Sequence, residues 1–156
     1  MNPGSTRDRG LKPLVLVENE RTVDGKYDHW QDKTGVRYHY PNMYRNRVQT
    51  GRKFLYYRGS LRAGGVKGTP EYFGSGIIGG ISEDPDTKQL PRTNRHWFCQ
   101  LESYEPFSTP IPFKLDNEYI EPAMHSNYWG TAVREIPWDV FDRVLRMSRS
   151  SFSPLG

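Results

Sequence analysis

The length, charge and composition of the chain exclude several classes of protein. It has 156 residues, a formal net charge of +4 and a mean hydropathy of -0.82. A chain of this length has room for one ordinary domain. No apolar run approaches the roughly 20 residues of a membrane helix, and the first residues lack the apolar stretch of a secretory signal. We therefore expect a cytoplasmic protein with a flexible leader at 1–12, one folded domain at 13–147 and a flexible tail at 148–156.

Apolar and β-branched runs predict a series of short strands in chain order. They lie at 14–17, 36–40, 53–58, 72–81 and 97–104. Polar stretches rich in glycine or proline predict loops at 18–35, 60–70 and 83–91, and a helical turn fits within 42–48. Pro41 should end the second strand. Three further prolines should keep the chain after 104 out of regular interior structure, namely Pro106, Pro110 and Pro112.

Two periodicities show which residues share a face. In the strand at 53–58, alternation places Phe54, Tyr56 and Arg58 on one face and Leu55 and Tyr57 on the other. From Pro137 onward, helical spacing predicts an amphipathic helix whose apolar face carries Trp138, Phe141, Val144, Leu145 and Met147. Several short strands with one good helix, and no regular alternation of the two, favour the α+β class. The expected architecture is a strongly curved sheet or small β-barrel with peripheral helices.

Candidate motifs for catalysis or cofactor binding lack the neighbouring elements or the residue spacing that such sites require. Residues 74–79 have the spacing of a dinucleotide-binding fingerprint, but an acidic turn follows where a helix would have to begin. We interpret them as a bent strand whose glycines admit a close neighbour. The histidines and the single cysteine, Cys99, show no metal-ligand spacing, and His96 should lie on the opposite face of its strand from Cys99. We expect no metal site, no cofactor and no catalytic activity in the chain itself.

Basic and aromatic residues are concentrated in one segment. There is no Asp or Glu from Lys33 to Pro70, which predicts a positive patch for phosphate contacts if the segment folds to one face. The phosphate candidates are Arg37, Arg45, Arg47, Arg52, Lys53, Arg58, Arg62 and Lys67. Rings interleave with these cations, as a base-stacking platform requires. Two alternatives stay open: the cations form a merely solvated face, and some of the rings, among them Tyr38, Tyr40, Phe54 and Tyr56, share a face because they are core.

The order of these motifs is similar to that of EVE-type modules of the PUA superfamily, especially those at the N-terminus of HNH-nuclease, modification-dependent restriction enzymes. The similarity extends from Tyr27-Asp28 through 35–41, 51–59 and 72–79 to 104–113 and 132–134. It implies a PUA-like (EVE-like) barrel whose pocket accepts a flipped base, commonly a modified cytosine such as 5-methylcytosine or 5-hydroxymethylcytosine. By position, the resemblance makes the pocket candidates Trp30, Tyr38, His39, Tyr40 and Tyr57. The chain has no HNH motif, so the resemblance does not imply cleavage.

The sequence thus predicts a reader of modified bases in double-stranded DNA that serves restriction or defence. It would be either an excised domain or a standalone protein that acts with a separate nuclease domain or subunit. Two other functions remain as alternatives. One is a hydrolase of the related ASCH kind acting on a modified nucleoside or RNA, and the other is an RNA-binding module.

Overall fold

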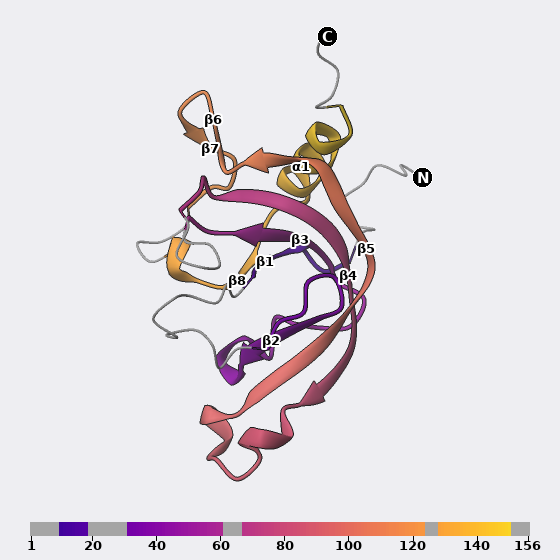
Figure 1. Ribbon diagram of the computed structural model, residues 1–156, viewed down its shortest axis with the longest axis vertical. Helices are drawn as coiled ribbons and strands as arrows, with labels where there is room; N and C mark the ends of the chain where they lie inside the picture. The colour runs from indigo at the N-terminus through magenta and orange to yellow at the C-terminus, as the bar shows by residue number, and fades with distance from the viewer. Residues whose placement is uncertain (1–9, 19–30, 61–66, 124–127, 151–156) are drawn as a thin grey trace.

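The computed structural model describes residues 10–18, 31–60, 67–123 and 128–150 of the chain (Figure 1). Trp30 and Arg62, which the sequence suggests as a pocket residue and a phosphate contact, lie outside these residues, as do most of the predicted leader and tail. Among the described helices, none has the length and apolar character needed to cross a membrane.

A curled sheet of six strands forms the body of the protein, in the spatial order β2-β5-β4-β3-β1-β8. Neighbouring strands in this sheet are antiparallel, except for β1 and β3, which are parallel. The strands are β1 Leu14–Val17, β2 Arg37–Pro41, β3 Lys53–Arg58, β4 Glu71–Glu83, β5 His96–Pro112 and β8 Val133–Glu135. A small hairpin joins β6 Lys114–Leu115 to β7 Glu118–Tyr119, and helix α1 spans Trp138–Ser150. The 3-10 turns are η2 Asn42–Tyr44, η4 Pro85–Thr87, η5 Arg92–Asn94 and η6 Tyr128–Gly130.

The two long strands, β4 and β5, give the sheet its curl. They run side by side along one side of the molecule (Figure 1), and β4 pairs with β3 near its start while β5 pairs with β2 near its own start. Three register shifts interrupt the β4–β5 ladder, between residues 72 and 74, 75 and 77, and 78 and 81 of β4. Such bulges bend a strand and increase its twist, so the pair wraps around an interior.

Side chains from β2, from η2 and from the turn after η2 cross the interior and bind the strands at the other edge of the sheet. The hydroxyl of Tyr38 donates to the carbonyl of Val17 at 2.8 Å, and that of Tyr44 accepts from the amide of Ala132 at 3.0 Å. The guanidinium of Arg47 donates to the carbonyl of Val133 at 2.6 Å. These bonds satisfy backbone groups at the ends of β1 and β8, and they close the curl without a continuous ladder.

The sheet buries a separate apolar core on each face. The inner core contains Phe54 and Tyr56, and the outer core contains Leu55 and Tyr57, so the predicted alternation in β3 is confirmed. Helix α1 covers the outer core with Trp138, Val140, Phe141 and Val144. The inner core is rich in rings because Tyr38, Tyr40, Phe54 and Tyr56 all point into it, each with no exposed surface. The interpretation of these four rings as core is therefore confirmed.

The structure confirms the short strands and corrects the end of β5. The first strand and β3 have the predicted bounds, and the glycine-containing segment is a bent strand. The predicted end of this strand at Tyr104 is wrong, because β5 continues through Pro106 and Pro110 to Pro112. The amide of Leu101 still donates to the carbonyl of Val36, and beyond it β5 pairs, among the described residues, only with β4. A proline is compatible with an edge strand because the N–H that it lacks would face away from the ladder.

Candidate nucleic-acid interface

Three aromatic rings lie together where β1 and β3 end, and we call them the ring cluster: Tyr56, Phe73 and Tyr104. The rings of Tyr56 and Phe73 stack with centroids 4.5 Å apart and planes at 27°. Tyr104 meets Tyr56 edge-on, at 5.9 Å and 83°. Tyr56 is buried, Phe73 is 8% exposed and Tyr104 is half-buried. The cluster therefore leads from the inner core to the surface.

A carboxylate and a guanidinium act on the ring cluster. Glu18, which directly follows β1, is half-buried and accepts a hydrogen bond from the hydroxyl of Thr34. The guanidinium carbon of Arg58, the last residue of β3, lies 4.9 Å from the centroid of Phe73. Burial raises the pKa of Tyr104, the charge of Glu18 adds to this rise and that of Arg58 opposes it. Burial and then Glu18 likewise raise the pKa of Tyr56. The cluster thus brings aromatic rings, a carboxylate and a cation together within one small region.

Backbone features hold Tyr104 in the ring cluster. Ser103 has a φ of 51°, in the left-handed region, beside a register shift of the β4–β5 ladder. The ring of Tyr104 then packs against Gly35 and Gly74, where an added Cβ would stand 2.6 and 2.7 Å from ring carbons. Sequence reasoning did not identify Tyr104, Phe73 or Glu18 as site residues. The available signal was the glycine content of β4, which indicated a close neighbour without indicating which one.

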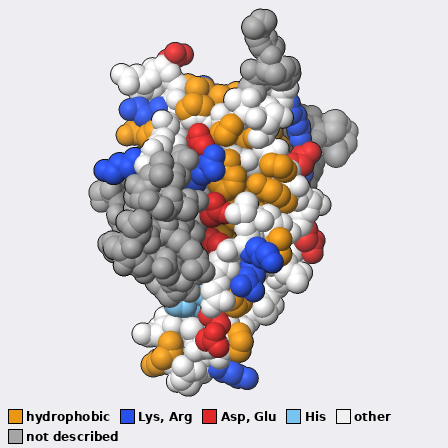
Figure 2. Space-filling view, in the orientation of Figure 1, with side chains coloured by type: hydrophobic (Ala, Val, Ile, Leu, Met, Phe, Trp, Pro, Cys, Tyr) orange, Lys and Arg blue, Asp and Glu red, His pale blue; other side chains and the backbone are white. Residues whose placement is uncertain are grey.

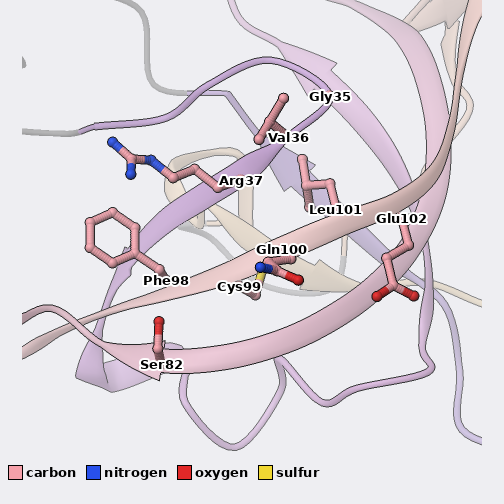
Figure 3. A pocket seen from close by; sticks show the side chains of 9 residues that line it. All are labelled: Gly35, Val36, Arg37, Ser82, Phe98, Cys99, Gln100, Leu101 and Glu102. Carbon is pink, nitrogen blue, oxygen red and sulfur yellow. The ribbon is translucent and has the colours of Figure 1, made fainter.

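A hollow of about 590 Å³ adjoins the ring cluster through Gly35 (Figure 3). Residues 98–102 of β5 line it together with residues 35–37 and Ser82 of β4, and Phe98, Gln100 and Glu102 stand at alternate positions of β5. Figure 3 shows Arg37 beside the ring of Phe98, with Gln100 and Glu102 farther along β5. The guanidinium carbon of Arg37 is 4.7 Å from the centroid of Phe98. The hollow is therefore polar at both ends, with an aromatic side at the Arg37 end.

The predicted pocket residues point to different parts of the molecule. Tyr38 and Tyr40 lie in the inner core, and Tyr57 lies in the outer core at 5% exposure. His39 points away from both tyrosines and stacks on Phe98 at 4.4 Å. The structure does not bring these four residues together around one space. Tyr56 is buried in the same inner core as Tyr38 and Tyr40, but it also contacts the rings of Phe73 and Tyr104.

His39, Asp84 and His96 form the one group of three within the described chain that could hold a metal, with ligand atoms within 4.8 Å of one another. Hydrogen bonds at His39 oppose this use. The amide of Gln31 donates to its Nδ1 at 2.9 Å, so Nδ1 carries no proton, and Nε2 lies 2.9 Å from Asp84. A metal on Nε2 would displace the proton to Nδ1, where it would face the N–H of Gln31. The geometry instead fits a neutral histidine that donates to Asp84.

The predicted phosphate contacts have different environments. Lys53 and Lys67 are exposed, whereas Arg58 is half-buried and bonds Glu71 at 2.9 and 2.5 Å. Arg45 lies over the ring of Trp97 at 5.5 Å. On the face shown in Figure 2, basic and acidic side chains are interspersed among hydrophobic ones. No continuous positive patch is visible on this face, so the patch stays a prediction.

Arg52 is an exception among the phosphate candidates, because it is only 5% exposed. Its guanidinium donates to the carbonyl of Lys12 at 2.8 and 2.6 Å and to that of Arg47 at 3.1 Å, and it pairs with Glu135 at 3.0 Å. With its donors directed at the protein, Arg52 joins the segment before β1 to the start of β3 and is not presented to a ligand.

A second buried arginine, Arg134, packs against the ring of Tyr57. Arg134 is 1% exposed and bonds Glu121 with both Nε and Nη2, at 2.8 and 2.7 Å. Glu121, also 1% exposed, accepts from the hydroxyls of Tyr72 at 2.7 Å and Tyr128 at 2.5 Å. The guanidinium carbon of Arg134 lies 4.7 Å from the centroid of Tyr57. All these groups are mutually satisfied, so this network stabilises the fold and offers nothing to a ligand.

Comparison with solved structures identifies the fold. The chain is similar to the N-terminal domain of Staphylothermus marinus McrB, with a TM-score of 0.55 and 14% identity over 87% of this chain and 94% of that one. It is also similar to Rpa0253 from Rhodopseudomonas palustris, with a TM-score of 0.52 and 13% identity over 89% and 94%. No protein-family model and no curated protein gives a match. The curled sheet with its helix is thus an α+β, PUA-like fold, as the sequence predicted.

Proposed function

We propose that this protein reads modified bases in double-stranded DNA by accepting a flipped base, a modified cytosine, at the ring cluster. It would serve restriction or defence as a binding module, with any cleavage supplied by a separate nuclease domain or subunit. The family resemblance of the sequence supports this function, and so does the fold that the chain shares with the N-terminal domain of McrB.

The observation that carries the proposal is that burial decreases across the ring cluster, from the fully buried Tyr56 to the half-buried Tyr104. A cation, Arg58, and an anion, Glu18, lie next to these rings. An extrahelical base is held by stacking on rings and is read by hydrogen bonds to its edge. Tyr104 supplies a half-buried ring beside the buried ring of Phe73, and Arg58 lies over Phe73 at 4.9 Å. In the hollow next to the cluster, Arg37 can contact the DNA backbone that leads to the flipped base.

A binding panel tests the proposal. Matched duplexes carry cytosine, 5-methylcytosine or 5-hydroxymethylcytosine at one position, and RNA versions serve as a second set. We expect the protein to prefer a modified duplex. Tyr104→Leu keeps an apolar side chain but removes the ring, and loss of one stacked base costs about 1–3 kcal/mol, or roughly five- to 150-fold in preferred binding.

The matched control for Tyr104→Leu is Tyr119→Leu on β7. Tyr119 is 49% exposed and packs on Trp129 at 5.0 Å, away from the ring cluster. Its replacement should leave the preference intact. A parent protein without preference for any modified DNA would overturn the proposed function, and a preference confined to RNA would replace it with the RNA-binding alternative.

Background affinity provides a separate test of the phosphate contacts. Each neutralised phosphate contributes about -0.9 to the slope of log affinity against log salt concentration. The double variant Lys53→Gln, Lys67→Gln removes two exposed cations, so it should make the slope shallower while the ratio between modified and unmodified duplex stays constant. A ratio that falls with the slope would show that charge, and not the ring cluster, produces the preference.

The proposed absence of catalysis is tested by incubation with the same oligonucleotides and with free modified nucleosides. The described residues contain no activated nucleophile next to the ring cluster, and the only thiol, Cys99, is buried, with its pKa raised by burial to about 12. Mass spectrometry should find every substrate unchanged. Turnover that scales with protein and survives repurification would favour the hydrolase alternative.

A further inference from the structure

We propose that Glu18 determines which base the ring cluster accepts, by taking a hydrogen bond from the exocyclic amino group of cytosine. This inference rests on the proposed function, and it assigns a specificity-determining role to a residue outside the basic and aromatic segment. It follows from the position of Glu18, from its contact with Thr34 and from the hydrogen-bonding capacity of a carboxylate.

Glu18 lies at the edge of the ring cluster. It directly follows β1, where the amide of Glu18 donates to the carbonyl of Tyr57 at 2.8 Å. This bond fixes the backbone of Glu18 beside the end of β3, next to the ring cluster. The side chain is half-buried, and its charge contributes to the raised pKa values of both Tyr56 and Tyr104. A base stacked on the cluster would therefore have its edge near this carboxylate.

The orientation of Glu18 is restrained by Thr34, whose hydroxyl donates to Oε2. Thr34 precedes Gly35, and Gly35 packs on the ring of Tyr104. The turn that holds the carboxylate is thus the same turn that borders the ring cluster. The other cluster-side charge, Arg58, is bound to Glu71 at 2.9 and 2.5 Å, so its position is fixed by a different partner.

The chemistry of the carboxylate then selects the ligand. An ionised Glu accepts hydrogen bonds and cannot donate them. Cytosine presents an N4 amino donor, whereas thymine presents an O4 acceptor at the same place. An acceptor facing an acceptor leaves two polar groups unpaired in a partly buried site, which costs about 1–3 kcal/mol, or roughly five- to 150-fold in affinity. The cluster should accept 5-methylcytosine and reject thymine, which carries the same methyl group.

The experiment compares 5-methylcytosine with thymine, each opposite an abasic site so that no base pair has to be broken for either. The parent protein should bind the 5-methylcytosine duplex at least about fivefold more tightly. Glu18→Gln keeps the size of the side chain and can still accept from Thr34, but its amide can also donate to O4, so the preference should largely disappear. Thr34→Val, at an exposed position, should weaken the preference without removing the carboxylate.

Glu102→Gln is the matched control, because Glu102 is an exposed carboxylate that lines the hollow next to the cluster. Circular dichroism and thermal melting establish that each variant is folded. The inference fails if the parent protein does not distinguish the two bases, if folded Glu18→Gln and Thr34→Val both keep the full preference, or if Glu102→Gln abolishes it. The proposed function is judged separately, by the preference for 5-methylcytosine over unmodified cytosine in paired duplexes.

Discussion

Replacing Glu121 by Gln should destabilise the protein more than any change to a surface ion pair. Glu121 accepts four hydrogen bonds, two from Arg134 and one each from Tyr72 and Tyr128, at distances of 2.5–2.8 Å. The carboxylate balances the charge of a guanidinium that is only 1% exposed. Burial alone would lower the pKa of Arg134, but hydrogen bonding and the charge of Glu121 raise it. An amide in place of the carboxylate removes the balancing charge and turns one of its two acceptor atoms into a donor.

The expected cost is about 3–5 kcal/mol, which is typical of leaving one member of a buried pair charged and uncompensated. For a domain of this size, about 2–4 °C is lost per kcal/mol, so the melting temperature should fall by about 6–20 °C. Urea unfolding followed by circular dichroism measures the free energy directly. The matched control is Glu105→Gln, whose partner Arg149 lies 3.8 Å away with side chains 67% and 70% exposed. It should cost less than about 1 kcal/mol.

A double variant separates the charge imbalance from simple loss of contacts. Glu121→Leu combined with Arg134→Met removes both charges, and buried pairs replaced by apolar side chains often cost little. The double variant should therefore be less destabilised than Glu121→Gln alone, although it leaves two tyrosine hydroxyls without their acceptor. The reasoning is refuted if Glu121→Gln costs no more than Glu105→Gln, or if the double variant is destabilised by more than the single one.

Three further predictions concern single residues. Gly76→Ala should lower the melting temperature more than Gly80→Ala, because its Cβ would stand 2.7 Å from the ring of Phe54, whereas at Gly80 the nearest atom is a flexible side chain 3.6 Å away. Cys99 should resist thiol reagents at pH 8 until the protein is unfolded, since burial raises its pKa to about 12. Burial also lowers the pKa of His39 from 6.5, so its neutral form stabilises the fold above pH 6.5 and this contribution is lost as the pH falls toward the lowered value. His39→Gln should flatten the fall in unfolding free energy on acidification.

The strands most accurately predicted from the sequence are those whose limits depend on local chemistry. The residues of β1 and β3 form short apolar runs flanked by polar residues and glycines, so both predictions have the observed bounds. The sequence did not predict the full extent of β5, because a proline disrupts a strand only where a neighbouring strand would accept a hydrogen bond from the N–H that proline lacks. Whether Pro106 has such a neighbour depends on where β2 stops pairing, and no local pattern contains that information.

The candidate site was less predictable, because burial separates residues that look alike in sequence. Tyr40 and Tyr56 both alternate with other residues in ring-rich strands, but Tyr56 also contacts rings that approach the surface. Arg52 and Lys53 are adjacent cations, yet one is 5% exposed and bonds three residues of the protein, while the other is exposed. Glu18 was assigned to a loop, and its link to the rings appears only when β1 and β3 are paired.

The glycines of β4 show how the meaning of a motif depends on the element that carries it. Their spacing resembles a fingerprint for phosphate binding, but in a strand each missing Cβ allows a side chain from a neighbouring strand to lie flat against the backbone. Gly74 accepts the ring of Tyr104 and Gly76 accepts that of Phe54. A side chain at Gly74 would push Tyr104 away from Tyr56 and open the ring cluster. Gly74 also lies at a register shift of the β4–β5 ladder, so the bend of the sheet and the ring cluster meet at this residue.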